Sequence, residues 1–156
     1  MKHVHFLDRW NAKKLQLNPT TDCLISVNDT ETEECEMGYI HAHMNETDSI
    51  LTLLFSDIDD ASQYSFQKEM AEKVVSFVNK NQSKENFYVH CFAGVSRSAA
   101  IAKYINDILV LDDMRLEGYS MYNRYVYNML MGVSGASLKS YYEALEQQER
   151  TDPYAE

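Results

Sequence analysis

The chain passes from an apolar run into a helical run through the stretch His90-Cys91-Phe92-Ala93-Gly94-Val95-Ser96-Arg97-Ser98-Ala99. Aromatic and β-branched residues precede it at 87–89, as in a buried strand, and small apolar residues follow it at 99–102, as in a helix. A loop between a strand and a helix turns several backbone N–H groups toward one point, and the helix N-terminus adds partial positive charge. The stretch therefore predicts an anion-binding loop.

The side chains of this loop suit chemistry on a bound anion. Arg97 can offer a planar guanidinium to two oxygens at once, and Gly94 permits a positive φ where the loop curves tightly. Cys91 lies in the same positive field, which favours a thiolate that can attack phosphorus. Ser98 can donate a hydrogen bond to the sulfur. His90 can hold the loop by hydrogen bonds, because adjacent residues of a strand point to opposite sides.

A thiolate that attacks a phosphoester leaves the departing oxygen in need of a proton, and a carboxylic acid is the simplest donor. Asp57, Asp59 and Asp60 lie in an acidic loop directly after the apolar run at 49–55. If that run and the run at 87–90 are parallel strands of one sheet, their following loops share the edge where open α/β sheets bind ligands. These three aspartates are the candidate acids.

Strand and helix signals along the chain predict an α/β fold with a central, mostly parallel sheet flanked by helices. We expect buried strands at 22–27 and 49–55 and further strands at 3–7 and 87–90. We expect helical segments at 9–17, 63–80, 95–110, 121–131 and 137–148. A break is expected at 132–135, and 28–37 is interpreted as a solvated acidic loop. Residues 1–156 are expected to form one domain with a frayed tail from about 149.

Composition excludes several classes of partner. The formal net charge is −10 and Lys and Arg form no cluster, so nucleic acids and anionic membranes are not expected. No apolar run approaches the length of a membrane span, and the N-terminus has no apolar signal region. Cys23, Cys35 and Cys91 form no CxxC pair, which argues against a disulfide framework and favours a reducing, cytoplasmic setting. Cys23 is expected to be buried and Cys35 to lie in an exposed loop.

A two-histidine metal site is conceivable at His41 and His43, which alternate and would share one face of a strand. No third ligand is indicated. Two surface histidines are the plainer interpretation, and we expect no metal site.

The pattern His90-Cys91-x5-Arg97-Ser98 matches the HCx5R[S/T] signature of the protein tyrosine phosphatase superfamily, and the full stretch resembles its dual-specificity form, HCxAGxSRS. More loosely, residues 22–131 are similar to small bacterial and phage tyrosine-phosphatase-like proteins. That similarity rests on Phe55-Ser56-Asp57-Ile58 and Tyr122-Asn123-Arg124-Tyr125-Val126-Tyr127. The resemblance implies a phosphatase for phosphorylated proteins or peptides that uses no cofactor. A chain this short has no evident long loop for phosphotyrosine recognition, so phosphoserine and phosphothreonine are also expected substrates.

The resemblance also implies roles for individual residues. By the resemblance, Cys91 would be the nucleophile, Arg97 would clamp the phosphate and Asp57 would be the general acid. Ser98 would assist the departing thiolate. Asp59 and Asp60 are the alternative acids. The phosphate cradle is formed by the backbone N–H groups of Phe92, Ala93, Gly94, Val95, Ser96 and Arg97. Phe92 stands where a polar or basic residue is common, and its apolar rim suits an aromatic phosphoester.

Other interpretations stay open from sequence alone. The loop could belong to a phosphate-binding module without turnover, although Cys91, Arg97 and a candidate acid together argue against this. Rhodanese-like or arsenate-reductase-like sulfur chemistry also uses a loop from cysteine to arginine, but the Ala-Gly-x-Ser-Arg-Ser form would be unusual there. A chance placement of Cys91 and Arg97 is the remaining alternative. The oligomeric state is undetermined.

Overall fold

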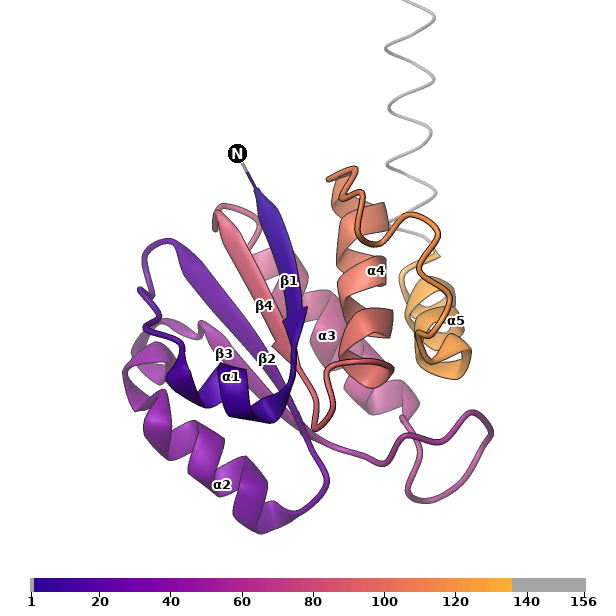
Figure 1. Ribbon diagram of the computed structural model, residues 1–156, viewed down its shortest axis with the longest axis horizontal. Coiled ribbons are helices and arrows are strands. Elements are labelled where there is room, and N and C mark those ends of the chain that lie inside the picture. The colour runs from indigo at the N-terminus through magenta and orange to yellow at the C-terminus, as the bar shows by residue number, and fades with distance from the viewer. Residues whose placement is uncertain (1, 136–156) are drawn as a thin grey trace, which may run out of the picture.

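Four apolar segments form one parallel sheet in the computed structural model, which describes residues 2–135 (Figure 1). The strands are β1 (His3–Leu7), β2 (Asp22–Asn28), β3 (Ile50–Leu54) and β4 (Asn86–His90). Their order across the sheet is β1-β4-β2-β3, and each pairing between neighbours is parallel. The predicted α/β fold with a central parallel sheet is confirmed.

The register brings the carboxyl ends of the strands to one edge of the sheet. Leu7 and Ser26 both pair with His90, while Asn28 pairs with Leu54. The chain therefore leaves the sheet near positions 8, 29, 55 and 91 at the same edge. Ligand sites of open α/β sheets lie at this carboxyl edge.

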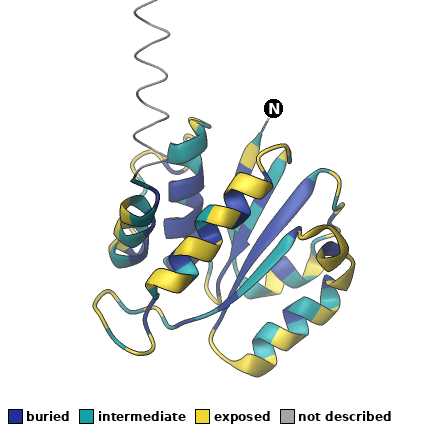
Figure 2. Cartoon of the chain, turned by 180° about the vertical axis from the view of Figure 1, so that it is seen from behind, coloured by how far each residue is buried: buried dark blue, intermediate teal, exposed yellow. Residues whose placement is uncertain are grey.

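Helices cover both faces of the sheet, because successive side chains of each strand point to opposite faces and both faces are largely apolar. On one face, α1 (Arg9–Lys14), α2 (Glu31–Ile40) and the 3₁₀ helix η1 (Ala42–Thr47) pack on Leu24 and Tyr88. On the other face, α3 (Lys68–Lys80), α4 (Arg97–Leu109) and α5 (Arg124–Val133) pack around Ile25 and Val89. Figure 2 shows the buried strands behind helices whose outward sides are exposed.

The two middle strands are better protected than the outer ones. All seven residues of β2 are buried, whereas β3 lies at an edge of the sheet and buries only Leu53. The strand predicted at 49–55 is therefore present as β3, but it is less buried than expected.

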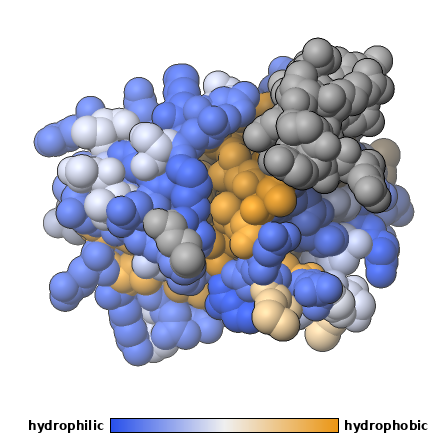
Figure 3. Space-filling view, turned by 90° about the horizontal axis from the view of Figure 1, so that it is seen from above, coloured by the Kyte–Doolittle hydropathy of each residue, from blue (hydrophilic) through white to orange (hydrophobic). Residues whose placement is uncertain are grey.

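At the end of the molecule opposite the carboxyl edge, apolar side chains gather between hydrophilic ones (Figure 3). Within residues 2–135, no helix combines the length and the apolar character needed to cross a membrane.

The loop predicted at 28–37 is also wrong, because α2 occupies most of it. Thr30 caps this helix: its Oγ1 accepts a hydrogen bond from the N–H of Glu33 at 3.1 Å. Three glutamates stand in the first turn, where the helix dipole favours negative charge. Only Met37 of this helix is buried, so the sequence lacks the apolar periodicity that marks a packed helix.

Several predicted helix boundaries change in the structure. Helix α1 ends at Lys14, and α3 begins at Lys68 rather than at 63, after a loop that buries Phe66. Helix α5 continues through Gly132, where a break was predicted. The helix predicted at 137–148 and the tail from 149 lie outside the described residues.

Candidate active site

The loop at 91–96 joins β4 to α4 at the carboxyl edge and is held tightly against the end of β1. Gly94 has a φ of +70°, and a Cβ at this position would lie 2.5 Å from the backbone N of Asp8 and 2.6 Å from the carbonyl carbon of Leu7. The N–H of Cys91 donates to the Leu7 carbonyl at 3.3 Å. The first strand thus forms one wall of the loop, and only glycine fits at the point of contact.

Three loop carbonyls are bound by groups outside the loop, and this sets the direction of the loop amides. The backbone N–H of Arg9 donates to the carbonyl of Phe92 at 3.1 Å, and the backbone N–H of Asn123 donates to the carbonyl of Ser96, also at 3.1 Å. The Tyr119 hydroxyl donates to the carbonyl of Val95 at 2.6 Å. In a planar trans peptide the N–H points away from the adjoining C=O. The N–H groups of residues 93, 96 and 97 are therefore directed toward the interior of the loop. This arrangement suits the predicted anion cradle.

Cys91 lies at the base of this loop, where it is only 2% exposed. The backbone N–H of Gly94 donates to its sulfur at 3.2 Å, and the Ser98 hydroxyl lies 3.1 Å from the same atom. Both groups can donate to a thiolate, the reactive form of cysteine. Cys91 and Ser98 are thus in direct contact, in the pairing that the sequence predicts.

His90 is fully buried and its two ring nitrogens are both occupied. Nδ1 lies 3.1 Å from the Cys91 carbonyl and Nε2 lies 2.6 Å from the Ser26 hydroxyl. Burial lowers the pKa of His90 from 6.5 to about 4, so the ring is neutral at pH 7. A carbonyl accepts only, so Nδ1 carries the proton and Nε2 accepts from Ser26. His90 is therefore placed to hold the loop, and neither nitrogen is free to act as a base.

Arg97 is 5% exposed and is oriented by two acceptors at the carboxyl edge. Its Nη1 donates to the Phe55 carbonyl and to Asp29 Oδ1, both at 2.7 Å, and its Nη2 reaches Asp29 Oδ2 at 3.3 Å. These bonds use three of the five guanidinium N–H groups. The remaining two, on Nε and Nη2, share one edge and have no hydrogen-bond partner among the described residues. Arg97 thus keeps one bidentate edge for an anion while Asp29 holds the opposite end.

Asp57 is brought to the rim of the loop, on the side of Ser96. Its Oδ1 accepts from the Ser96 hydroxyl at 2.9 Å and from Asn123 Nδ2 at 2.8 Å. Its Oδ2 accepts no hydrogen bond from residues 2–135. Asp59 lines a cavity of about 400 Å³ together with Asp57. Within residues 2–135, neither Asp59 nor Asp60 forms a hydrogen bond to the loop. Of the three candidate acids, Asp57 is therefore the one that contacts the loop in the described part of the chain.

Two residues of this constellation were not predicted from sequence. Asp29 follows β2 at the carboxyl edge, so the same argument from the sheet edge that pointed to Asp57, Asp59 and Asp60 could also have found it. Asn123 caps α5 through its Oδ1, which accepts from the N–H of Val126 at 3.0 Å, while its Nδ2 reaches Asp57. Only the cap is visible in a local sequence pattern.

The conceivable metal site at His41 and His43 is not formed. The two residues follow α2 rather than alternating on a strand, and their Nε2 atoms lie 2.9 Å from the Ala12 carbonyl and 2.8 Å from the Leu17 carbonyl, respectively. His41 is buried, contrary to the expected surface position. In the described part of the chain, no group of three or more His, Cys, Asp or Glu side chains could hold a metal ion.

The two other cysteines are remote from the chemistry of the loop. Cys23 is buried, as predicted, and burial raises the pKa of its thiol to about 12. Cys35 is exposed as predicted, although it lies on α2 rather than in a loop.

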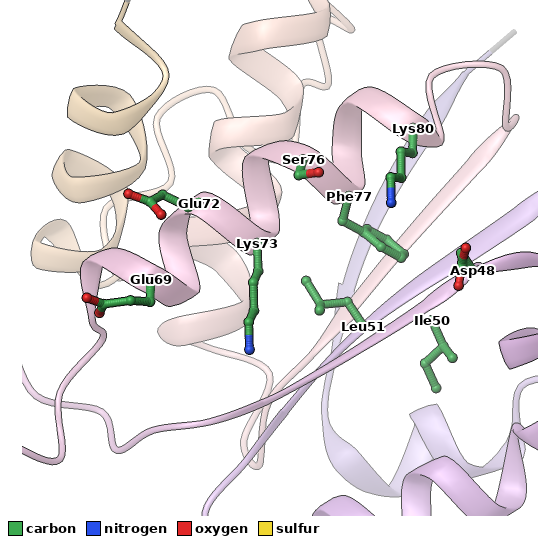
Figure 4. Close-up of a pocket in the computed structure, with 9 residues that line it drawn as sticks. All are labelled: Asp48, Ile50, Leu51, Glu69, Glu72, Lys73, Ser76, Phe77 and Lys80. Carbon is green, nitrogen blue, oxygen red and sulfur yellow. The ribbon is translucent and has the colours of Figure 1, made fainter.

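A separate cavity of about 480 Å³ lies between α3 and the free edge of β3 (Figure 4). Lys73, Phe77 and Lys80 extend from the helix toward Ile50 and Leu51 of the strand. It contains no cysteine or histidine, and none of the loop residues lines it. It is therefore not part of the candidate site.

Among known proteins, the chain has a distant likeness to a solved structure. No family model and no curated protein matches the chain. Among solved structures, the crystal structure of Tk-PTP in the active form is similar, with 14% sequence identity and a TM-score of 0.41. The alignment covers 86% of this chain and 79% of that chain. A sequence identity and a TM-score this low carry no information about the roles of single residues, so the site is described from its own geometry.

Proposed function

We propose that the chain is a cysteine-dependent phosphatase that hydrolyses phosphotyrosine, and also phosphoserine and phosphothreonine, on proteins or peptides. One arrangement carries the proposal: the Cys91 sulfur contacts the Gly94 N–H and the Ser98 hydroxyl, and Arg97, in the first turn of the same helix α4, keeps one edge of its guanidinium unbonded among the described residues. A tetrahedral phosphate presents oxygens to several donors at once and its phosphorus to the sulfur. The resemblance of the loop to the HCx5R signature supports the same chemistry.

In the first step, the Cys91 thiolate attacks phosphorus and the bond from phosphorus to the ester oxygen breaks. The two free N–H groups of Arg97 and the loop amides hold the nonbridging oxygens, where negative charge is stabilised in the transition state. The product is a cysteinyl phosphate. The departing alkoxide or phenoxide takes a proton from Asp57.

Asp57 is suited to this proton transfer by its surroundings. Ser96 and Asn123 both donate to Oδ1, which leaves Oδ2 to carry the proton toward the leaving oxygen. Asp57 is exposed at the rim, so a substrate can reach it. Ser96 and Asn123 act here as positioning residues.

In the second step, a water molecule attacks the phosphorus and gives a proton to the Asp57 carboxylate. The bond between sulfur and phosphorus breaks and inorganic phosphate is released. The hydroxyl of Ser98, 3.1 Å from the sulfur, donates to the departing thiolate. Each group returns to its starting protonation state.

The experiment that tests the proposal measures hydrolysis of p-nitrophenyl phosphate and of a phosphotyrosine peptide. We expect Cys91-dependent turnover by the wild type and none by Cys91→Ser. Cys35→Ser is the matched control, because Cys35 is exposed on α2 and is not part of the loop, so its replacement should leave the rate unchanged. Acid quenching during turnover should trap phosphate on Cys91. A wild type that binds the phosphopeptide without hydrolysing it would instead identify a phosphate-binding module.

A further inference from the structure

Two clefts flank the loop at 91–96 on opposite sides. Figure 1 shows α1 on one side of this loop and the long loop that follows β3 on the other. The cleft beside the β3 loop is polar and includes Asp57, Ser96 and Asn123. The cleft beside α1, about 310 Å³ in volume, lies between Trp10 and Phe92. We call it the Trp10–Phe92 cleft.

The Trp10–Phe92 cleft is built from two aromatic side chains that remain open to solvent. Trp10 is 65% exposed and Phe92 is 61% exposed. The bond from Arg9 N–H to the Phe92 carbonyl ties the two segments together at 3.1 Å, and the buried Ala12 holds α1 on the sheet. Exposed aromatic surface of this kind gains free energy when an apolar group covers it. The cleft is therefore a ready apolar surface directly beside the nucleophile's loop.

The charged side chains that line the cleft already have partners, and the ammonium groups of Lys13 and Lys14 lie over the Trp10 ring at 5.6 and 5.1 Å from its centroid. Arg9 contacts Glu33 and Glu36 at 3.4 and 3.1 Å, and Lys13 contacts Glu36 at 2.5 Å. Asp8, which also lines the cleft, accepts hydrogen bonds from Asn11. An acidic or basic ligand would have to compete with these contacts. An uncharged apolar or aromatic side chain suits the cleft better.

The geometry of the displacement places the leaving group of the phosphoester on the side of the loop away from the Trp10–Phe92 cleft. In an in-line displacement, the leaving oxygen lies opposite the attacking sulfur and must reach the acid. Asp57 stands on the Ser96 side of the loop, and no atom of Cys91 or Arg97 lines the Trp10–Phe92 cleft. The leaving group is therefore directed toward the polar side, and the Trp10–Phe92 cleft faces another part of the substrate.

We propose that the Trp10–Phe92 cleft binds an apolar, preferably aromatic, side chain next to the phosphorylated residue of a peptide substrate. This inference rests on the proposed phosphatase function. It makes Trp10 and Phe92 specificity-determining residues that read the sequence around the phosphoester. Continuity with the loop supports it, because Phe92 directly follows Cys91 and its carbonyl is bound by the segment that carries Trp10.

The test compares phosphotyrosine peptides that carry Phe or Ala directly before or directly after the phosphotyrosine. We expect kcat/KM for the better Phe peptide to exceed that of its Ala counterpart by about fivefold, as for partial burial of one aromatic ring. In Trp10→Ala this ratio should fall to about one, and in Trp10→Phe it should stay above one. Tyr39→Ala is the matched control, because Tyr39 is an aromatic residue 85% exposed on α2 and should keep the wild-type ratio.

A second readout needs no change in the cleft. Trp10 is the chain's only tryptophan, so intrinsic fluorescence reports directly on this site. In Cys91→Ser, the Phe peptide should change Trp10 emission in a saturable way, and the Ala peptide should do so only at about fivefold higher concentration.

The outcomes separate the two proposals. Equal kcat/KM for Phe and Ala peptides in a wild type that hydrolyses both would overturn the cleft assignment and leave the phosphatase proposal standing. A ratio that survives in Trp10→Ala would also overturn it. No turnover of any peptide or of p-nitrophenyl phosphate would overturn the phosphatase proposal itself.

Discussion

Replacing Gly94 by alanine tests how closely the loop depends on its contact with β1. The residue has a φ of +70°, where an L side chain costs about 1–2 kcal/mol. The new Cβ would also stand 2.5 Å from the backbone N of Asp8, and backbone cannot swing aside as a flexible side chain can. Forced shifts of this kind cost about 1–3 kcal/mol. Gly94→Ala should therefore lower the free energy of unfolding by about 2–5 kcal/mol.

Gly118 provides a matched control for the backbone conformation. Its φ is +78°, but a Cβ there would meet no atom within 4 Å. Gly118→Ala should cost only the conformational part, about 1–2 kcal/mol. Urea unfolding followed by circular dichroism gives both values, and their difference isolates the contact between the loop and β1.

The same substitution should impair turnover more than stability alone explains. The Gly94 N–H donates to the Cys91 sulfur, so a shift of the loop moves a donor away from the nucleophile. We expect kcat for p-nitrophenyl phosphate to fall about tenfold or more under conditions where the variant is folded. A Gly94→Ala protein as stable as Gly118→Ala, with the wild-type rate, would refute this account of the loop.

Three further substitutions test the charged and titrating groups around the loop. Asp57→Ala should slow phosphotyrosine hydrolysis about 100-fold and affect esters with acidic leaving groups far less; an equal loss across leaving groups would point to another acid. Asp29→Asn should lower kcat about tenfold with a smaller change in the inhibition constant of phosphate, since Asp29 orients Arg97 rather than supplying charge; the reverse split would contradict this role. Burial lowers the pKa of His90 from 6.5 to about 4, so between these pH values the unfolded chain binds a proton at His90 that the folded chain does not. As the pH falls from 6.5 to 4, the free energy of unfolding should therefore fall by up to about 3 kcal/mol. His90→Asn should flatten that slope in pH-dependent urea unfolding, and a slope parallel to wild type would show that other groups cause it.

Sequence reasoning worked best where the deciding residues are contiguous. The strands were predicted because each is a short apolar run bounded by polar residues, and their parallel arrangement followed from the helices between them. The loop around Cys91 could be interpreted in full because strand, turn and helix signals occur within fifteen residues. Its internal contact, between Cys91 and Ser98, is also local.

Sequence reasoning failed where the apolar periodicity of a helix is weak, or where contacts between distant segments determine the position of a residue. Helix α2 buries one residue, so periodicity gave no signal, although the Thr30 cap with Glu33 three residues later is a recognisable helix start. The partners of the loop come from distant segments. Asp29 meets Arg97 because β2 lies beside β4 in the sheet. Asn123 meets Asp57 because the start of α5 is bonded to the loop through the Ser96 carbonyl.

The pairing of β1 with β4 has a consequence for when the site assembles. His3 pairs with Asn86, so one wall of the loop is contributed by the start of the chain and the loop itself by a segment synthesised much later. Bringing β1 and β4 together closes a long segment of chain, which costs conformational entropy. Contacts between residues so far apart in the sequence also slow folding. Among residues 2–135, β1 pairs with β4 alone, so during synthesis it waits for this partner until β4 emerges from the ribosome. We therefore expect the nucleophile's loop to gain its native shape late, after β2 and β3 have paired, so that a partly folded chain carries Cys91 without the loop that activates it.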